Sequence, residues 1–269
     1  MHTRPTPFGA ELKRWRTHRR FSQLQLATVA HVSQRHLSYL ETGRTKPSRE
    51  MVIHLATTLE VPLRSQNDLL VAAGYAPVYP ETPLGEPALD QVRRVIDFLL
   101  SAHEPYPAIV VDRRWDIVAS NTAATQLVAR LINPATAPVG ERVNLARLTF
   151  HPDGLRSVTV NWDTTAGAVL LRLERELADR AGDAALAALF DEMLGYPGVA
   201  ELRRGPAIPV GDDLLIPIHY RTGNFEARLF STVATIGAAY DVTLEELRLE
   251  TFFPVDAASD EALRRSATD

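Results

Sequence analysis

The sequence has no cysteine and no long apolar run. Without a cysteine in 269 residues, disulfides, thiolate zinc sites and cysteine nucleophiles are excluded. No stretch of 18 or more apolar residues occurs, so we expect no membrane-spanning helix. The first residues, MHTRPTP, lack the apolar segment that a secretion signal requires. We therefore expect a cytoplasmic protein with no membrane association.

The short motifs of common enzyme classes are also missing. There is no His-Glu-x-x-His, no Gly-x-Ser-x-Gly, no phosphate-binding loop and no Gly-x-Gly-x-x-Gly. His103, His151 and His219 are isolated from one another in the sequence. We expect no catalytic residue, no metal site and no cofactor, and so no enzyme.

Charge is distributed unevenly along the chain. The net charge is -4, yet residues 1–76 carry 11 Lys and Arg against 5 Asp and Glu, a net of +6, while the remainder carries 18 against 28, a net of -10. A basic segment attracts phosphate and an acidic segment is repelled by it. The two parts are therefore expected to meet different partners, with only the first suited to a phosphate-bearing one.

Residues 22–41 predict two short helices joined by a tight turn. Ser22 and Ser33 are suitable N-caps, because a serine oxygen can accept a hydrogen bond from an unpaired amide of the first helical turn. His31 falls where the turn needs a positive φ, which histidine tolerates better than most residues. The residues expected to face inward from the first helix are Leu24, Ala27 and Val29. The pattern is typical of a helix-turn-helix; the alternative is an ordinary helical hairpin with a polar outer face.

The second of these helices has an outer face that suits a DNA major groove. Its polar side chains can donate or accept hydrogen bonds at base edges. The loop after it is basic, and Arg44 and Lys46 are expected to bind phosphates. The candidate DNA-contacting residues of this region are Ser33, Gln34, Arg35, His36, Tyr39, Arg44 and Lys46.

The chain is expected to form two domains joined by a linker. Further helices over 8–20, 48–59 and 62–73 complete a five-helix, all-α module in residues 1–76. Residues 77–87 are rich in proline, which prevents regular helix and favours a stiff, extended linker. Residues 88–269 form the second domain.

The second domain mixes helical and strand patterns, so the chain is α+β. A helix beginning at Ala88 has an apolar stripe that is either core or a dimer seam. Helices are further expected over 121–132, 144–150, 162–180 and 184–194, and strands over 108–112, 115–119, 207–210, 214–220, 226–236 and 246–253. These strands should form one antiparallel sheet with helices packed on it.

Six segments together resemble a known family. They are VSQRHLSYLETGR (32–44), KPSRE (46–50), AAGY (72–75), PAIVVDRRWD (107–116), NTAA (121–124) and TFFPVD (251–256). They are similar to the Xre-type helix-turn-helix regulators with a MmyB-like ligand-binding domain, found in bacteria and especially in actinobacteria. The resemblance implies a PAS-like fold for the second domain.

The resemblance also implies partners. It places Gln23 at the start of the supporting helix, where it can buttress the recognition helix and touch a phosphate. It implies a homodimer on a palindromic operator, with half-sites about one helical turn apart, and repression is the commoner mode of regulation. It further implies a pocket for a small lipophilic molecule such as a fatty acid.

Candidate pocket residues follow from the chemistry of apolar sites, which aromatic side chains and a few polar groups usually line. The candidates are Tyr106, Trp115, Asn121, Trp162 and Tyr220. Each could equally be a core residue, and Asn121 could be a helix cap. Two alternatives remain open for the second domain: one that only dimerises or contacts a protein partner, and a sensor with haem or flavin chemistry.

Overall fold

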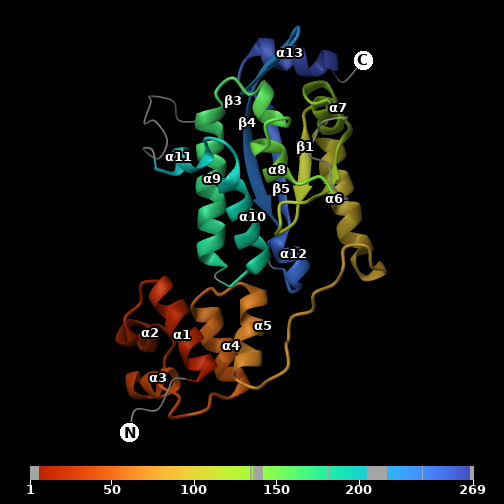
Figure 1. Cartoon of the computed structure of the whole chain (residues 1–269). Coiled ribbons are helices and arrows are strands. Elements are labelled where there is room, and N and C mark those ends of the chain that lie inside the picture. Colours follow the sequence, from red (N-terminus) through yellow and green to blue (C-terminus); the bar gives the residue numbers. More distant parts are fainter. Residues whose placement is uncertain are drawn as a thin grey trace. The chain divides into compact units, whose positions relative to one another are not determined.

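The computed structural model describes residues 6–133, 135, 142–180, 182–204, 217–237 and 239–266 (Figure 1). The chain divides into two compact units. The first comprises Met1–Pro83 with Gly237–Glu245, and the second comprises Leu84–Ile236 with Glu246–Asp269. The strand expected over 207–210 lies outside the described residues. No helix in the described part of the chain is long and apolar enough to cross a membrane.

The first unit contains the five expected helices. They are α1 (Pro7–His18), α2 (Gln23–Val29), α3 (Gln34–Glu41), α4 (Arg49–Thr58) and α5 (Leu63–Ala72). The oxygens of Ser22, Ser33 and Ser48 accept hydrogen bonds from amides three residues further on, which fixes where α2, α3 and α4 begin. His31 has φ 52°, so the turn between α2 and α3 has the expected geometry without glycine.

The expected inward face of α2 is wrong at two positions. Leu24 and Val29 are 60% and 52% exposed, whereas Leu26, Ala27 and Ala30 are buried. Leu24 lies two residues from Leu26, and Val29 two residues from Ala27, which is a rotation of about 200° on a helix. These two side chains therefore point away from the face that packs on the core.

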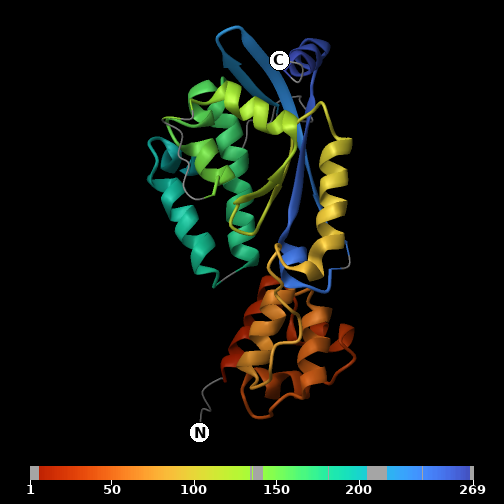
Figure 2. The same cartoon turned by 90° about the vertical axis from the view of Figure 1, so that its right-hand side faces the viewer.

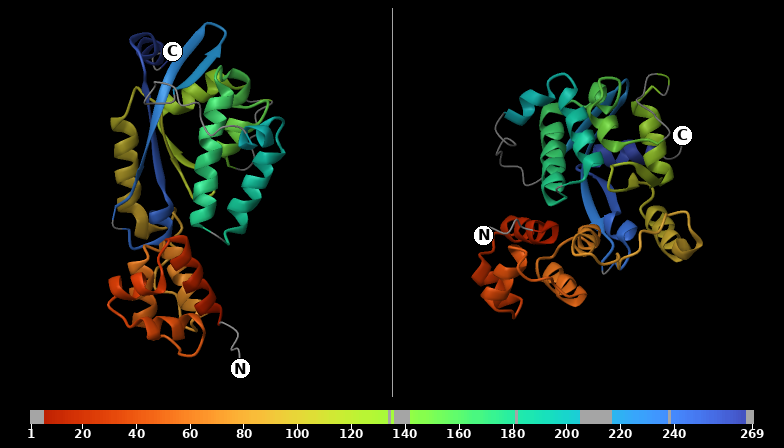
Figure 3. Two further views of the ribbon diagram at one scale, coloured as in Figure 1. Left: turned by 90° about the vertical axis from the view of Figure 1, so that its left-hand side faces the viewer. Right: turned by 60° about the horizontal axis from the view of Figure 1, so that its bottom comes forward.

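The second unit is a five-stranded antiparallel sheet with helices, the PAS-like fold expected. Its strands are β1 (Ala108–Val111), β2 (Ile117–Ser120), β3 (Ile218–Thr222), β4 (Phe225–Thr235) and β5 (Arg248–Pro254), in the order β2-β1-β5-β4-β3. Its principal helices are α6 (Asp90–Ala102), α7 (Thr122–Leu131), α8 (Leu145–Phe150), α9 (Trp162–Asp179) and α10 (Ala184–Gly195). Helices α7 to α10 lie on one side of the sheet and α6 on the other (Figures 2 and 3).

Three helices have no counterpart among the sequence predictions. They are α11 (Val199–Arg204), α12 (Val242–Glu246) and α13 (Ala257–Ser266). Most of α12 belongs to the first unit, although the strands on either side of it belong to the second. Within the first unit, the Leu63 amide donates to Glu245 Oε2 over 2.8 Å and the Val242 amide donates to Pro80 O over 2.8 Å.

A buried carboxylate joins three helices of the first unit. Glu41, at the end of α3, accepts hydrogen bonds from Arg16 Nε of α1 over 2.6 Å and from Gln23 Nε2 of α2 over 2.8 Å. The Glu41 and Arg16 side chains are only 3% and 11% exposed. Because both charges are paired away from water, removing one partner leaves the other uncompensated.

Glu41→Ala should therefore destabilise the helix-turn-helix. We expect the free energy of opening of α2 and α3 to fall by about 3 to 5 kcal/mol, measured by hydrogen exchange of peptides from residues 23–41. Glu11 is the control, because it pairs with Arg14 over a similar 2.8 Å but at the surface. Glu11→Ala should change the opening free energy by less than about 1 kcal/mol, and equal losses in both variants would contradict the special role of Glu41.

Candidate nucleic-acid interface and ligand cavity

Helix α3 presents a polar face at its N-terminal end. Gln34 and Arg35 are exposed, and His36 and Tyr39 are half-buried beside them. The inner face is anchored by Leu37 and Leu40, which are fully buried. This division holds the polar side chains outward on a helix whose rotation about its own axis is fixed by the core.

Two arginines flank Tyr39. Arg35 Nε donates to the Tyr39 hydroxyl over 2.9 Å, and its guanidinium lies 5.3 Å from the ring centroid. The Arg44 guanidinium, from the loop after α3, lies 5.6 Å from the same centroid. The structure thus brings the base-facing and phosphate-facing candidates together around one aromatic ring.

Ser33 and Gln23, two further candidate DNA-contacting residues, also have structural partners. Ser33 Oγ accepts from the His36 amide over 3.1 Å, so its oxygen caps α3 and its proton stays available to donate. Gln23 Nε2 donates to Glu41 Oε2 over 2.8 Å, which ties the start of α2 to the end of α3. The second N–H of that amide remains able to reach a phosphate.

Lys46 extends the cationic surface beyond α3. It is exposed, and its ammonium lies 5.2 Å from the centroid of the Tyr75 ring. The Tyr75 hydroxyl donates to Pro47 O over 2.8 Å, which ties the loop to the residue that follows α5 and Gly74. Lys46 is therefore positioned by packing as well as by chain connectivity.

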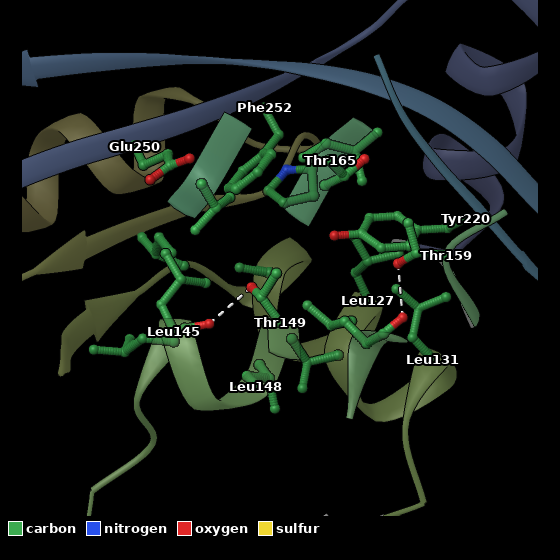
Figure 4. Close-up of a pocket in the computed structure, with 18 of the residues that line it drawn as sticks. Leu127, Leu131, Leu145, Leu148, Thr149, Thr159, Thr165, Tyr220, Glu250 and Phe252 are labelled. Atoms are coloured by element: carbon green, nitrogen blue, oxygen red, sulfur yellow. Dashed lines mark hydrogen bonds between the residues drawn. The ribbon is translucent and has the colours of Figure 1, made fainter. Parts of the chain in front are cut away.

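The second unit contains an apolar cavity of about 90 Å³ that is partly open to solvent. It lies between the sheet and helices α7, α8 and α9 (Figure 4). Its lining, mainly apolar with a few polar groups, is that of a small-molecule site. The wall includes Ile109, Trp115, Leu127, Leu131, Leu145, Leu148, Val169, Ile218, Tyr220 and Phe252, with Thr149, Thr159, Thr165, Arg172 and Glu250 as polar members.

Two of the five candidate pocket residues line this cavity, and three lie elsewhere. Trp115 and Tyr220 are in its wall. Tyr106 instead donates its hydroxyl to Asp260 of α13 over 2.6 Å. Asn121 caps α7 through the Ala124 amide and also accepts from the Ala108 amide. Trp162 packs edge-on against Phe150, 6.4 Å between centroids, in the core between the helices.

The polar residues of the wall that sequence reasoning missed are Arg172 and Glu250. Arg172 NH1 donates to Glu250 Oε2 over 3.0 Å, and Arg172 Nε donates to Glu176 Oε1 over 3.2 Å. Trp115 Nε1 also donates to Glu176, and the Arg172 guanidinium lies 4.4 Å from the Trp115 ring centroid. Burial alone would lower the pKa of Arg172, but the carboxylates of Glu250 and Glu176 raise that pKa above its ordinary value.

Tyr220 supplies a polar group away from this cluster. Its side chain is buried, and Figure 4 shows its hydroxyl directed into the cavity. Burial, together with the negative charge of Glu250, raises the pKa of the Tyr220 hydroxyl. The group therefore stays protonated and able to donate a hydrogen bond.

Within the described residues, no group of three or more histidine or carboxylate side chains could hold a metal ion.

Comparison with known proteins assigns both units. Residues 7–69 match a helix-turn-helix domain family, and residues 92–265 match the MmyB-like transcription regulator ligand binding domain. No curated protein matches the chain. The two matches coincide with the polar α3 surface and with the cavity, and the second spans more than half of the sequence. The protein is a helix-turn-helix transcription regulator that belongs to the family with the MmyB-like ligand-binding domain.

Proposed function

We propose that this regulator is a cytoplasmic repressor that binds a palindromic operator as a homodimer and responds to a small lipophilic molecule. Residues 1–76 would bind DNA, 77–87 would link the domains, and 88–269 would bind the ligand and dimerise. The observation that carries the proposal is the occurrence, in one chain, of an exposed polar recognition helix and an apolar cavity containing few polar groups.

The α3 surface supports two different roles for its residues, contact with bases and contact with phosphates. Gln34, Arg35 and His36 lie in the first turn of the helix, the part that enters a major groove in this geometry. Arg44 and Lys46 lie in the loop after α3. Their positive charges would bind phosphates and would not contact base edges. Tyr39, between Arg35 and Arg44, would set the distance between the base contact and the phosphate contact.

Two arginine variants should separate base reading from phosphate binding. Arg35→Ala should weaken operator binding by about 1 to 3 kcal/mol and relax preference at one base pair. Arg44→Ala should weaken binding to all sequences alike and reduce the salt slope by about one. Fluorescence anisotropy over a set of single-base operator variants and several salt concentrations measures both effects. Identical losses on every sequence for both variants would show that the base-reading face is misassigned.

Helix α6 supports a dimer surface. Ile96 and Leu100 are buried toward the sheet, while Val95, Phe98 and Leu99 are exposed, Phe98 by 71%. Exposed apolar side chains three and four residues apart form a stripe of the kind that marks protein interfaces. A second copy of the chain would cover this stripe and present two recognition helices to two half-sites.

Phe98→Glu should convert the dimer to a monomer, because a charge would be buried at the centre of the interface. Sedimentation velocity of the full chain measures the change, and operator affinity should fall with it. Asp97 is also exposed on α6 but lies about 100° or more around the helix from Val95, Phe98 and Leu99, so Asp97→Lys should leave the dimer intact. A dimer that survives Phe98→Glu would place the interface elsewhere.

The cavity supports ligand binding over the alternative of a second domain that only dimerises or contacts a protein partner. A folded core is ordinarily packed without voids of this size, and the wall is mainly aliphatic and aromatic. Such a wall suits an alkyl chain, as in the fatty acids that the family resemblance suggests. A ligand would regulate DNA binding only by having different affinities for the operator-competent and incompetent states.

Native mass spectrometry of the purified protein tests this role. We expect a mass excess that solvent extraction identifies as a lipophile, and we expect Leu127→Trp to abolish it, because Leu127 lies in the cavity wall. Val160→Trp is the control, since Val160 is exposed outside the cavity. A mass equal to that of the chain alone, with no thermal stabilisation by added lipophiles, would favour a second domain that only dimerises or contacts a protein partner. Absorption of visible light by the purified protein would favour a sensor with haem or flavin.

A further inference from the structure

The first unit is completed by a segment that lies between two strands of the second. Gly237–Glu245 joins β4 to β5 and belongs to the first unit, although both strands belong to the second. The two strands pair up to Thr235 and Arg248 at the base of this β4–β5 connection. The connection is therefore attached at both ends to paired strands, one of which carries Glu250 and Phe252 in the cavity wall.

Helix α5 has no N-cap of its own. The residue before it is Pro62, which offers no side-chain oxygen to the amides of the first turn. Glu245 Oε2 accepts from one of these amides, that of Leu63, over 2.8 Å. The helix dipole also favours a carboxylate at this end. The start of α5 is therefore held by a residue 182 positions further along the chain.

The same connection holds the linker. The Val242 amide donates to Pro80 O over 2.8 Å, and Asp241 Oδ2 accepts from the Thr82 amide over 3.2 Å. Asp241 and Val242 are only 7% and 1% exposed, so water competes little for these bonds. Asp241 Oδ1 accepts from the Thr243 amide over 2.8 Å at the start of α12, which fixes the direction of the carboxylate.

The linker is in turn fastened to α5. Asn67 Oδ1 accepts from the amides of Val78 and Tyr79 over 2.9 and 3.1 Å. The Tyr79 hydroxyl donates to Gln66 Oε1 over 3.0 Å. Residues 78–82 thus make hydrogen bonds both to α5 and to the β4–β5 connection.

Helix α5 shares a core with the recognition helix. Leu69 and Leu70 of α5 are buried in the same cluster as Leu37 and Leu40 of α3. Close-packed side chains transmit a shift of one helix to its neighbours. A displacement at the start of α5 therefore reaches the helix that carries the polar surface.

We propose that the β4–β5 connection is the element through which a ligand in the cavity changes the DNA-binding unit. The inference rests on the proposed ligand-binding function and specifies how DNA binding is regulated. A displacement of β5 by the ligand is passed through Glu245 to the start of α5 and through Asp241 to the linker. Because a ligand acts only through different affinities for two states, these two contacts differ between the states.

Hydrogen exchange of the full chain tests the proposal, with dodecanoate below its micellar concentration as the probe. In the wild-type protein, saturating dodecanoate should change the exchange rate of peptides from residues 63–72 by about three-fold or more. The double variant Asp241→Ala/Glu245→Ala removes both carboxylate contacts and should abolish this change. The effect of dodecanoate on operator affinity should disappear in the same variant.

Calorimetry shows whether the double variant still binds the probe. Neither Asp241 nor Glu245 lines the cavity, so the dodecanoate affinity should stay within about two-fold of the wild-type value. The conservative double variant Asp241→Asn/Glu245→Gln keeps a side-chain oxygen at each contact and should retain the effect on α5.

Glu81→Ala is the control outside the connection. Glu81 accepts from Arg64 NH1 over 2.8 Å and is 55% exposed. The variant removes a bond between the linker and α5 that the β4–β5 connection does not make, so the dodecanoate effect should remain. An effect on α5 that persists in Asp241→Ala/Glu245→Ala would overturn the proposal.

The outcomes separate this inference from the proposed function. If dodecanoate binds the wild-type protein but leaves the exchange of residues 63–72 unchanged, the ligand-binding role stands and the connection is not the route. If dodecanoate does not bind, the lipophile role fails and this inference fails with it. The wild-type protein alone decides these two outcomes, so they do not depend on how well the variants fold.

Discussion

The alternation of side chains along β5 determines what each face of the second unit can do. As the central strand, β5 pairs with β1 on one side and with β4 on the other. Its register is therefore determined by hydrogen bonds to both neighbouring strands. Glu250 and Phe252 face the cavity, while Leu249 faces the groove beneath α6. A shift of one residue would move Glu250 away from Arg172, and with it the charge that gives the cavity a polar end.

The first unit depends on a buried charge in a similar way. Glu41 closes α3 against Arg16 and Gln23, and this fixes the rotation of the recognition helix about its own axis. Both units thus use a carboxylate–arginine pair to set the position of a functional surface. In the first unit the pair supports the surface from behind, whereas in the second Arg172 and Glu250 both line the cavity.

The sequence predicts best where the structural signal is local. Ser22 and Ser33 mark helix starts because a cap acts over three residues, and His31 follows from a local φ requirement. The buried face of α2 was harder to predict. Leu24 and Leu26 are both apolar, and in a helix of only seven residues the apolar pattern allows either of them to face the core. Arg172 and Glu250 are 78 residues apart, so only the folded sheet brings them together. A charged residue two positions before Phe252 in the same strand was the available signal.

The chain itself connects the strand that borders the cavity to the first unit. After β4 the chain passes into the first unit, where the Val242 amide donates to Pro80 O and Asp241 accepts from the Thr82 amide, and it then returns to β5. Glu250 therefore lies five residues from Glu245, which accepts from the Leu63 amide at the start of α5. If a ligand in the cavity displaces β5, it also displaces the segment that the start of α5 holds through Glu245. Between β5 and that segment such coupling needs no contact beyond the covalent chain, and its size is bounded by the ligand's differential affinity for the two states.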